Sequence, residues 1–228
     1  DRGAARMTRP YFVIFAAMRT GSNLLERLLG QLGEVKTFGE AFNPAFAGGP
    51  NKQPLKGWTL VERDADPLAY LAAMRKARPR KIIGFRHFEG HNPAVRRWAM
   101  ADPECAQIVL TRAPWESYVS LQLARATDQW LLTRPERRKA ARVRFDPRDY
   151  TAYAAAQEAY YAQLSGLRVD YAELLDLATV NRLAAHIGAS KRLDQIAPGI
   201  LRQNPEPLSA KVENYAEMVA ALGFDPEG

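Results

Sequence analysis

The sequence predicts an α/β fold in which a parallel sheet carries helices on both faces. Short apolar runs without polar alternation recur along the chain, as expected for strands that are buried on both sides. Helical patterns separate these runs, and strands that alternate with helices favour a parallel arrangement. Small polar or basic residues directly follow several of the runs, which is where ligands bind in such sheets.

Five strands and six helices are expected in alternation. The first strand, residues 11–16, reads YFVIFA and is rich in β-branched and aromatic residues. The other strands are expected at residues 34–38, 81–87 (KIIGFRH), 107–111 (QIVLT) and 166–171 (GLRVDY). Helical patterns cover residues 23–32, 67–78, 93–100, 115–132, 150–164 and 174–187. The tail turns helical again over residues 210–223.

The length of 228 residues fits a single domain, residues 1–228. Residues 122–148 are expected to form an insertion or lid that the sheet does not require, and residues 1–9 are expected to be flexible. The one cysteine, Cys105, excludes an intrachain disulfide and a cysteine-based zinc site. No run approaches the ~18 apolar residues that a membrane span needs, so we expect a cytoplasmic protein.

The net charge of +7 suits either a nucleic-acid binder or an enzyme with an anionic substrate. The sequence has no zinc-finger spacing, no repeat and no basic ladder with interleaved aromatic residues. Nucleic acid is therefore the less favoured partner. The densest basic run, residues 134–148, reads as a solvated surface rather than a specific anion site.

A small polar loop, Arg19-Thr20-Gly21-Ser22-Asn23, joins the first strand to the first helix. Backbone amides at a helix N-terminus bind anions, and a glycine there lets a phosphate come close. The loop lacks the lysine and the spacing of a Walker A motif, and no dinucleotide-binding glycine pattern is present. The alternative is an ordinary strand-to-helix turn with a serine or asparagine cap.

A second candidate anion site follows the strand at 107–111, where Arg112 ends the strand and Ser120 lies two helical turns later. The two elements together resemble the sulfotransferases that use 3′-phosphoadenosine 5′-phosphosulfate (PAPS). The stretch GLRVDYAELL resembles a segment of that family whose tyrosine lies near the adenine. The stretch PLSAKVENYAEM resembles the C-terminal segment of the bacterial, nodulation-type members, which closes over the nucleotide.

This resemblance runs from about Tyr11 to Met218 and implies a P-loop-like sheet and PAPS as the sulfuryl donor, without a metal. It implies that the first loop holds the 5′-phosphosulfate and that the second site holds the 3′-phosphate. Arg19 stands where eukaryotic cytosolic members carry lysine, and Leu24 replaces an aromatic residue of some relatives. The implied nucleotide-binding residues are Arg19, Thr20, Gly21, Ser22, Asn23, Leu24, Arg112, Ser120, Tyr171 and Lys211, with Arg202 as a further candidate beside Lys211.

Sulfuryl transfer to a hydroxyl needs a base, and two residues are candidates. Glu40 lies in KTFGEAFNP, which resembles the glutamate motif of carbohydrate sulfotransferases, and burial is expected to raise its pKa. His87 ends the strand at 81–87, near a catalytic histidine of other members. Both residues are carried as catalytic candidates together with Arg19, and His91 is a nearby competitor.

The sequence thus predicts a PAPS-dependent sulfotransferase that acts on a hydroxyl of a carbohydrate or glycolipid, with Trp130 and Trp58 as aromatic surfaces for a sugar. Two alternatives remain open, a P-loop-type nucleoside or small-molecule kinase and a non-catalytic nucleotide- or nucleic-acid-binding protein. The sequence names neither a particular acceptor nor an oligomeric state.

Overall fold

The computed structural model describes residues 11–50, 52, 55–132, 134–199 and 205–228. The expected flexible segment 1–9 and the candidate Arg202 lie outside the described residues.

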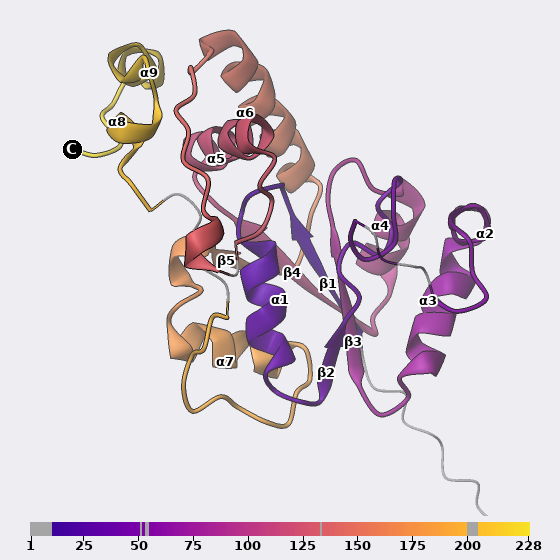
Figure 1. Ribbon diagram of the computed structural model, residues 1–228. Helices are drawn as coiled ribbons and strands as arrows, with labels where there is room; N and C mark the ends of the chain where they lie inside the picture. The colour runs from indigo at the N-terminus through magenta and orange to yellow at the C-terminus, as the bar shows by residue number, and fades with distance from the viewer. Residues whose placement is uncertain (1–10, 51, 53–54, 133, 200–204) are drawn as a thin grey trace, which may run out of the picture.

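A five-stranded parallel sheet forms the centre of the molecule (Figure 1). Its strands are β1 (Tyr11–Ala16), β2 (Val35–Thr37), β3 (Ile82–His87), β4 (Cys105–Thr111) and β5 (Leu167–Asp170), in the order β2-β3-β1-β4-β5. Every pairing is parallel. The predicted fold class is confirmed, and each predicted strand is present with its ends within two residues of the expected ones.

Helices cover both faces of the sheet. On one face lie α1 (Ser22–Gly30) and α7 (Leu177–His186), and on the other lie α3 (Pro67–Ala77) and α4 (Pro93–Ala101), with the short α2 (Leu60–Ala65) preceding α3 (Figure 1). The central strand β1 is buried along its whole length. Phe12 and Ile14 pack toward α1 and α7, whereas Val13 and Phe15 pack toward α3 and α4. Burial on both faces explains why the strand shows no polar alternation.

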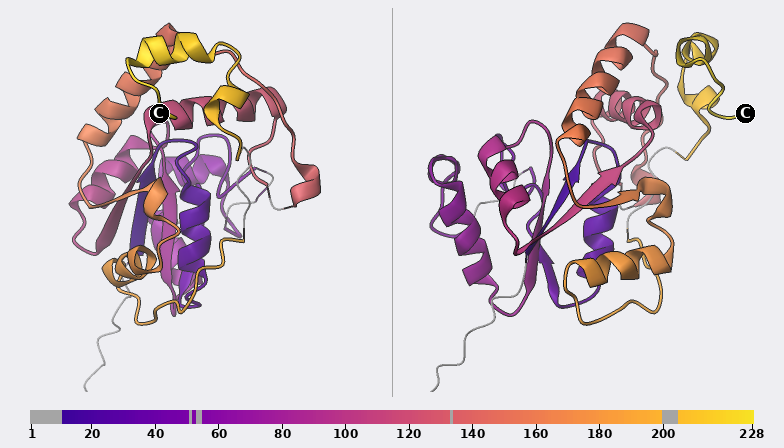
Figure 2. Two further views of the ribbon diagram at one scale, coloured as in Figure 1. Left: turned by 90° about the vertical axis from the view of Figure 1, so that its left-hand side faces the viewer. Right: turned by 180° about the vertical axis from the view of Figure 1, so that it is seen from behind.

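The remaining helices gather beyond the carboxyl ends of the strands (Figures 1 and 2). They are α5 (Pro114–Thr127), α6 (Pro147–Ala162), α8 (Leu208–Lys211) and α9 (Tyr215–Leu222), and they share a third hydrophobic cluster. Val143 forms a parallel bridge with Val212, and the Asn214 side chain binds the backbone N–H and C=O of Phe145. The C-terminal helices are therefore attached to the segment between α5 and α6.

Three predicted helices differ from the observed ones. The helix expected at 115–132 ends at Thr127, because Asp128 adopts a left-handed conformation with φ of 49°. The following residues are irregular apart from a 3₁₀ turn, η1 (Pro135–Arg137). The helix expected at 174–187 starts only at Leu177, where the Asp176 side chain accepts the Thr179 N–H, after a second 3₁₀ turn, η2 (Tyr171–Glu173). The helical tail is split into α8 and α9 at Asn214.

Within the part of the chain that the structure describes, every helix is too short or too polar to reach across a lipid bilayer.

The packing of β1 against β3 gives a test of the core. Gly84 of β3 faces Phe12 of β1, and a Cβ at Gly84 would lie 2.1 Å from Phe12 Cζ. Because Phe12 is fully buried and cannot move aside, Gly84→Ala should lower the free energy of unfolding by about 1–3 kcal/mol. Gly30→Ala is the control, since nothing lies within 4 Å of its Cβ position in α1, and it should leave stability unchanged or raise it. Urea unfolding measures both, and equal effects would contradict this packing.

Candidate functional site

The loop between β1 and α1 has the geometry of an anion-binding turn. Thr20 is fully buried and its hydroxyl donates to the Ala17 carbonyl at 2.8 Å, which closes the turn. Arg19 and Gly21 both have positive φ, 67° and 93°. Gly21 is the N-cap of α1 and offers no side-chain acceptor to the first helical amides. These amides and the positive end of the helix dipole are therefore available to an anion.

Arg19 connects this loop to the element after β4. Its Nε donates to Ser120 Oγ at 3.1 Å, and its Nη1 donates to the Trp130 carbonyl at 2.9 Å. Arg112 Nη1 in turn donates to the Arg19 carbonyl at 3.0 Å. The structure thus brings together Arg19, Ser120 and Arg112, which are up to 101 positions apart in sequence. Burial and the neighbouring Arg112 lower the pKa of Arg19 to about 10, so the Arg19 guanidinium is charged at neutral pH.

Tyr171 lies against both candidate anion-binding elements, the loop at Gly21 and Arg112. The Arg112 guanidinium stacks on its ring, 4.3 Å from the centroid, and the Arg112 Nε also lies 2.9 Å from Glu116 Oε2. A Cβ at Gly21 would lie 2.3 Å from Tyr171 Cδ2. Arg112 therefore occupies one face of the Tyr171 ring. The edge of the same ring lies so close to position 21 that a side chain larger than that of glycine would collide with it. Tyr171 acts as a support for the loop and for Arg112 in this structure.

Sequence reasoning missed Tyr161 of α6. Its hydroxyl accepts the Ala17 N–H at 2.9 Å and donates to the Leu110 carbonyl at 2.8 Å. One phenol thus joins the end of β1 to the end of β4, and so fixes the two anion-binding elements relative to each other. No sequence signal marks this residue, since it is one of several tyrosines in α6.

The other predicted nucleotide residues have different surroundings. Ser22 is buried, and its hydroxyl faces Arg86 Nη1 at 3.4 Å rather than the loop opening. Leu24 packs into the core beside α7, and Asn23 is half-buried in the first turn of α1. Lys211 ends α8, where it lines a hollow of about 320 Å³ together with Arg142 and Glu206. This hollow lies between the C-terminal helices and the segment before α6.

Glu40 lies in the loop after β2, at a bridge with Gly48. Its carboxylate accepts the Asn43 side-chain N–H at 2.8 Å and lies 3.5 Å from both Arg86 Nη2 and His91 Nε2. Arg63 of α2 fixes the shape of this loop. Its side chain is fully buried and donates to the Ala41 and Phe46 carbonyls. The Glu40 carboxylate is 16% exposed, so it is both fixed and reachable.

The expected rise in the pKa of Glu40 is wrong. Burial does raise the pKa of this carboxyl, but the contacts with His91, Arg86 and Asn43 outweigh burial, and the pKa lies below its ordinary value. Sequence reasoning included the desolvation but not the three donors, which come from other parts of the fold. Glu40 is therefore ionised at neutral pH, the state in which it can accept a proton.

His87 has no exposed surface. Its Nε2 lies 3.0 Å from the Asn92 carbonyl and must donate to it, and its Nδ1 lies 3.4 Å from the Tyr160 hydroxyl. Burial lowers the pKa of His87 to about 4, so the ring is neutral at pH 7. Both nitrogens face protein groups, which weighs against His87 as the residue that takes a proton from an acceptor.

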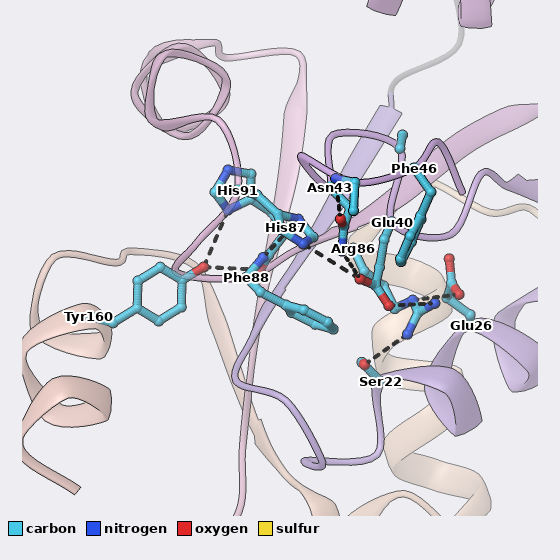
Figure 3. Close-up of polar contacts among 12 residues, drawn as sticks. Ser22, Glu26, Glu40, Asn43, Phe46, Arg86, His87, Phe88, His91 and Tyr160 are labelled. Atoms are coloured by element: carbon cyan, nitrogen blue, oxygen red, sulfur yellow. Dashed lines mark hydrogen bonds and ion pairs between the residues drawn. The ribbon is translucent and has the colours of Figure 1, made fainter. Parts of the chain in front are cut away.

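Two further charged residues of the site were given no role by the sequence, although Arg86 stands at a strand end where functional residues are expected. Arg86, on β3, and Glu26, on α1, are buried and form an ion pair with 2.8 Å between Arg86 Nε and Glu26 Oε2 (Figure 3). One feature of the sequence could have indicated this pair: each residue is a charged side chain inside an apolar pattern, Arg86 in KIIGFRH and Glu26 in SNLLERLL. Charged residues are rarely buried unless they are paired. This pair connects the loop after β1 with Glu40.

The two tryptophans suggested as sugar surfaces differ in exposure. Trp58 is partly buried and packs on Tyr70 with 5.2 Å between the ring centroids. Trp130 is 45% exposed and lies beside Arg19, which binds its carbonyl. Only Trp130 therefore offers an open aromatic face near the anion-binding loop.

One comparison with known proteins agrees with the sequence resemblance. No family model matches the chain. The chain is similar to Nodulation protein H of Rhizobium tropici, with 27% identity over 223 residues, which cover 91% of this chain and 87% of that protein. Among solved structures it is similar to a gluconokinase from Sinorhizobium meliloti 1021, with 13% identity and a TM-score of 0.40, over 79% of this chain and 96% of the other. The first match supports the resemblance to sulfotransferases that the sequence motifs carry.

The contact between Gly21 and Tyr171 predicts a coupled pair of substitutions. Gly21→Ala should lower the free energy of unfolding by about 1–3 kcal/mol, because alanine is strained at φ of 93° and its Cβ meets the Tyr171 ring. In a Tyr171→Ala background the same change should cost about 1 kcal/mol less, since the ring is gone but the strain remains. Strictly additive losses in a double-mutant cycle would contradict the contact.

Proposed function

We propose that this protein is a sulfotransferase that moves the sulfuryl group of PAPS to a hydroxyl of a carbohydrate or glycolipid. The observation that carries this proposal is the joining of the two anion-binding elements, in which Ser120 accepts from Arg19 and Arg112 binds the Arg19 carbonyl. Two charged guanidinium groups and a helix N-terminus at one edge of the sheet suit a nucleotide with phosphate groups at two positions. Four motifs in the family's order and the similarity to Nodulation protein H support the same activity.

In the proposed complex the loop from Arg19 to Asn23 holds the 5′-phosphosulfate, and Arg112 with Ser120 holds the 3′-phosphate. Arg19 stabilises the negative charge that develops on the leaving phosphate. The acceptor oxygen bonds to sulfur while the bond from sulfur to the bridging phosphate oxygen breaks. Adenosine 3′,5′-bisphosphate then leaves.

The proton of the acceptor hydroxyl passes to Glu40 in this proposal. Glu40 is ionised and partly exposed, whereas His87 is enclosed and bonded at both ring nitrogens. A carboxylate of low basicity can take the proton late, when the new bond to sulfur has made the hydroxyl acidic. Trp130, beside Arg19, offers the apolar face on which a sugar ring of the acceptor could stack.

Binding of adenosine 3′,5′-bisphosphate is the direct test of the donor site. Calorimetric titration should give micromolar affinity for the bisphosphate and much weaker binding of ATP and AMP, because only the bisphosphate places a 3′-phosphate on Arg112 and Ser120. A preference for ATP would instead favour a kinase, and the absence of nucleotide binding would reject the donor site altogether.

Variants of the two arginines separate binding from transfer. Arg112→Ala should weaken bisphosphate binding by about 10- to 100-fold, the value of one lost charge-assisted contact. Arg19→Ala should lower sulfuryl transfer from radiolabelled PAPS more than it lowers binding, because its charge acts on the leaving group. Arg97→Ala, an exposed arginine of α4, removes the same charge as a control and should change neither. Equal effects of Arg112→Ala and Arg97→Ala would reject the 3′-phosphate assignment.

A further inference from the structure

A row of buried polar side chains joins the helix of the donor loop to the candidate base. It runs from Glu26 on α1 through Arg86 on β3 to Glu40 and then to His91 in the loop before α4 (Figure 3). Glu26, Arg86 and His91 are each less than 9% exposed. The mechanism proposed above uses only Glu40, so the other three need a reason to be there. Buried charges are costly to retain, and an isolated one is costlier still.

The Arg86 guanidinium is shared unequally between two carboxylates. Its Nε lies 2.8 Å from Glu26 Oε2, whereas its Nη2 lies 3.5 Å from Glu40 Oε1. Its third nitrogen, Nη1, donates to Ser22 Oγ at 3.4 Å. The Arg86 guanidinium therefore lies closer to the Glu26 carboxylate than to that of Glu40, although its Nε is not aligned for a hydrogen bond with Glu26. Because electrostatic interaction falls with distance, Glu26 limits how strongly Arg86 stabilises the ionised form of Glu40.

Glu26 also fixes the position of Glu40 relative to the donor loop. Its Oε1 accepts the N–H of Gly39, the residue just before Glu40, at 3.1 Å. Ser22 lies four residues before Glu26 on the same helix, and both side chains meet Arg86. One carboxylate on α1 therefore binds the backbone next to the base and the guanidinium that the base contacts.

His91, the last residue of this row, contacts Glu40 through a ring whose tautomer is fixed by a second hydrogen bond. Its Nδ1 accepts the Phe88 N–H at 3.2 Å, so the ring proton of neutral His91 lies on Nε2, which faces Glu40 Oε2. The ring packs against Phe88 and His87, with centroids 5.0 Å and 5.4 Å away. His91 thus donates to the ionised Glu40 and is not itself available as the base while the Phe88 contact lasts.

We propose that Glu26 is a positioning residue that sets the basicity of Glu40 by holding Arg86, and that it keeps the base in register with the donor loop. This inference rests on the proposed function only in so far as Glu40 accepts the acceptor's proton. The charged and titratable groups that face this row are Arg86 from β3, His91 from the following loop, and Lys52, which acts on Glu26 from the loop after Gly48. His91 and Lys52 are unchanged in each of the variants described below.

The test is a direct titration of Glu40 by carbon-13 NMR of protein labelled at the glutamate side-chain carboxyl carbon. The Glu40 signal is identified by its loss in Glu40→Gln. Burial raises the pKa of Glu26 above its ordinary value even though Arg86 and the Gly39 N–H oppose this rise. Glu26→Gln keeps the acceptor for Gly39 but removes the carboxyl group that competes for Arg86, so Arg86 is released to Glu40. The pKa of Glu40 should then fall further, by about one unit.

The double variant Glu26→Gln/Arg86→Met should move the same pKa in the opposite direction. It removes both charges together and so leaves no buried charge unpaired, which protects the fold. Of the donors supplied by the described residues, Glu40 then keeps Asn43 and His91, and its pKa should rise above that of the unmodified protein. Thermal unfolding of both variants confirms that the titrated species is folded. If the Glu40 pKa rises or does not move in Glu26→Gln, the inference is overturned.

Transfer assays on the same variants separate this inference from the proposed function. Proton acceptance requires ionised Glu40, so transfer is lost as the pH falls through the pKa of Glu40. That loss should shift to lower pH in Glu26→Gln and to higher pH in the double variant. If the NMR shifts are as expected but no transfer from PAPS occurs at any pH, the network holds and the proposed function fails. If transfer occurs but its acid limb is the same in all three proteins, Glu26 does not set the basicity of Glu40.

Discussion

The candidate site depends on one buried guanidinium. Arg86 leaves the carboxyl end of β3 with almost no exposed surface and must find partners inside the protein. Glu26 on α1 and Glu40 after β2 supply them, so three elements meet at one cation. Removing either carboxylate would leave Arg86 with one acidic partner, and removing both would leave its charge unpaired in a dry environment, which is very costly. The arrangement therefore fixes the distance from the donor loop to the candidate base.

A second set of contacts assembles the positive end of the site. The loop after β1 and the helix after β4 are neighbours because β1 and β4 pair along six positions. Arg112 then binds the Arg19 carbonyl, and Tyr161 joins the ends of both strands. Two adjacent guanidinium groups repel each other, and this repulsion adds to the larger effect of burial in lowering the pKa of Arg19. An anion bound between them would relieve this repulsion, which is the electrostatic basis of the proposed donor site.

The two ends of the site have opposite electrostatic character. Around Arg19 and Arg112 positive charge is concentrated, whereas Glu40 is surrounded by donors that hold it ionised. In the proposed complex the negatively charged donor group would lie at the positive end and the acceptor hydroxyl beside Glu40, and transfer requires that the two be held close together and aligned. The loop of Glu40 keeps its shape because Arg63 binds two of its carbonyls from α2.

The sequence by itself determined the parallel α/β fold, since buried strands and intervening helices follow from local hydrophobic patterns. It also located the loop at Arg19 and the pair Arg112 and Ser120, because these lie at strand ends with a recognisable spacing. It failed at the helix beyond Thr127, where one left-handed residue ends a helical pattern. Only the tertiary structure decided that Glu26 and Arg86 belong to the site and that the pKa of Glu40 is lowered. These properties arise from partners that are far apart in the chain, and no local pattern encodes which buried charge meets which.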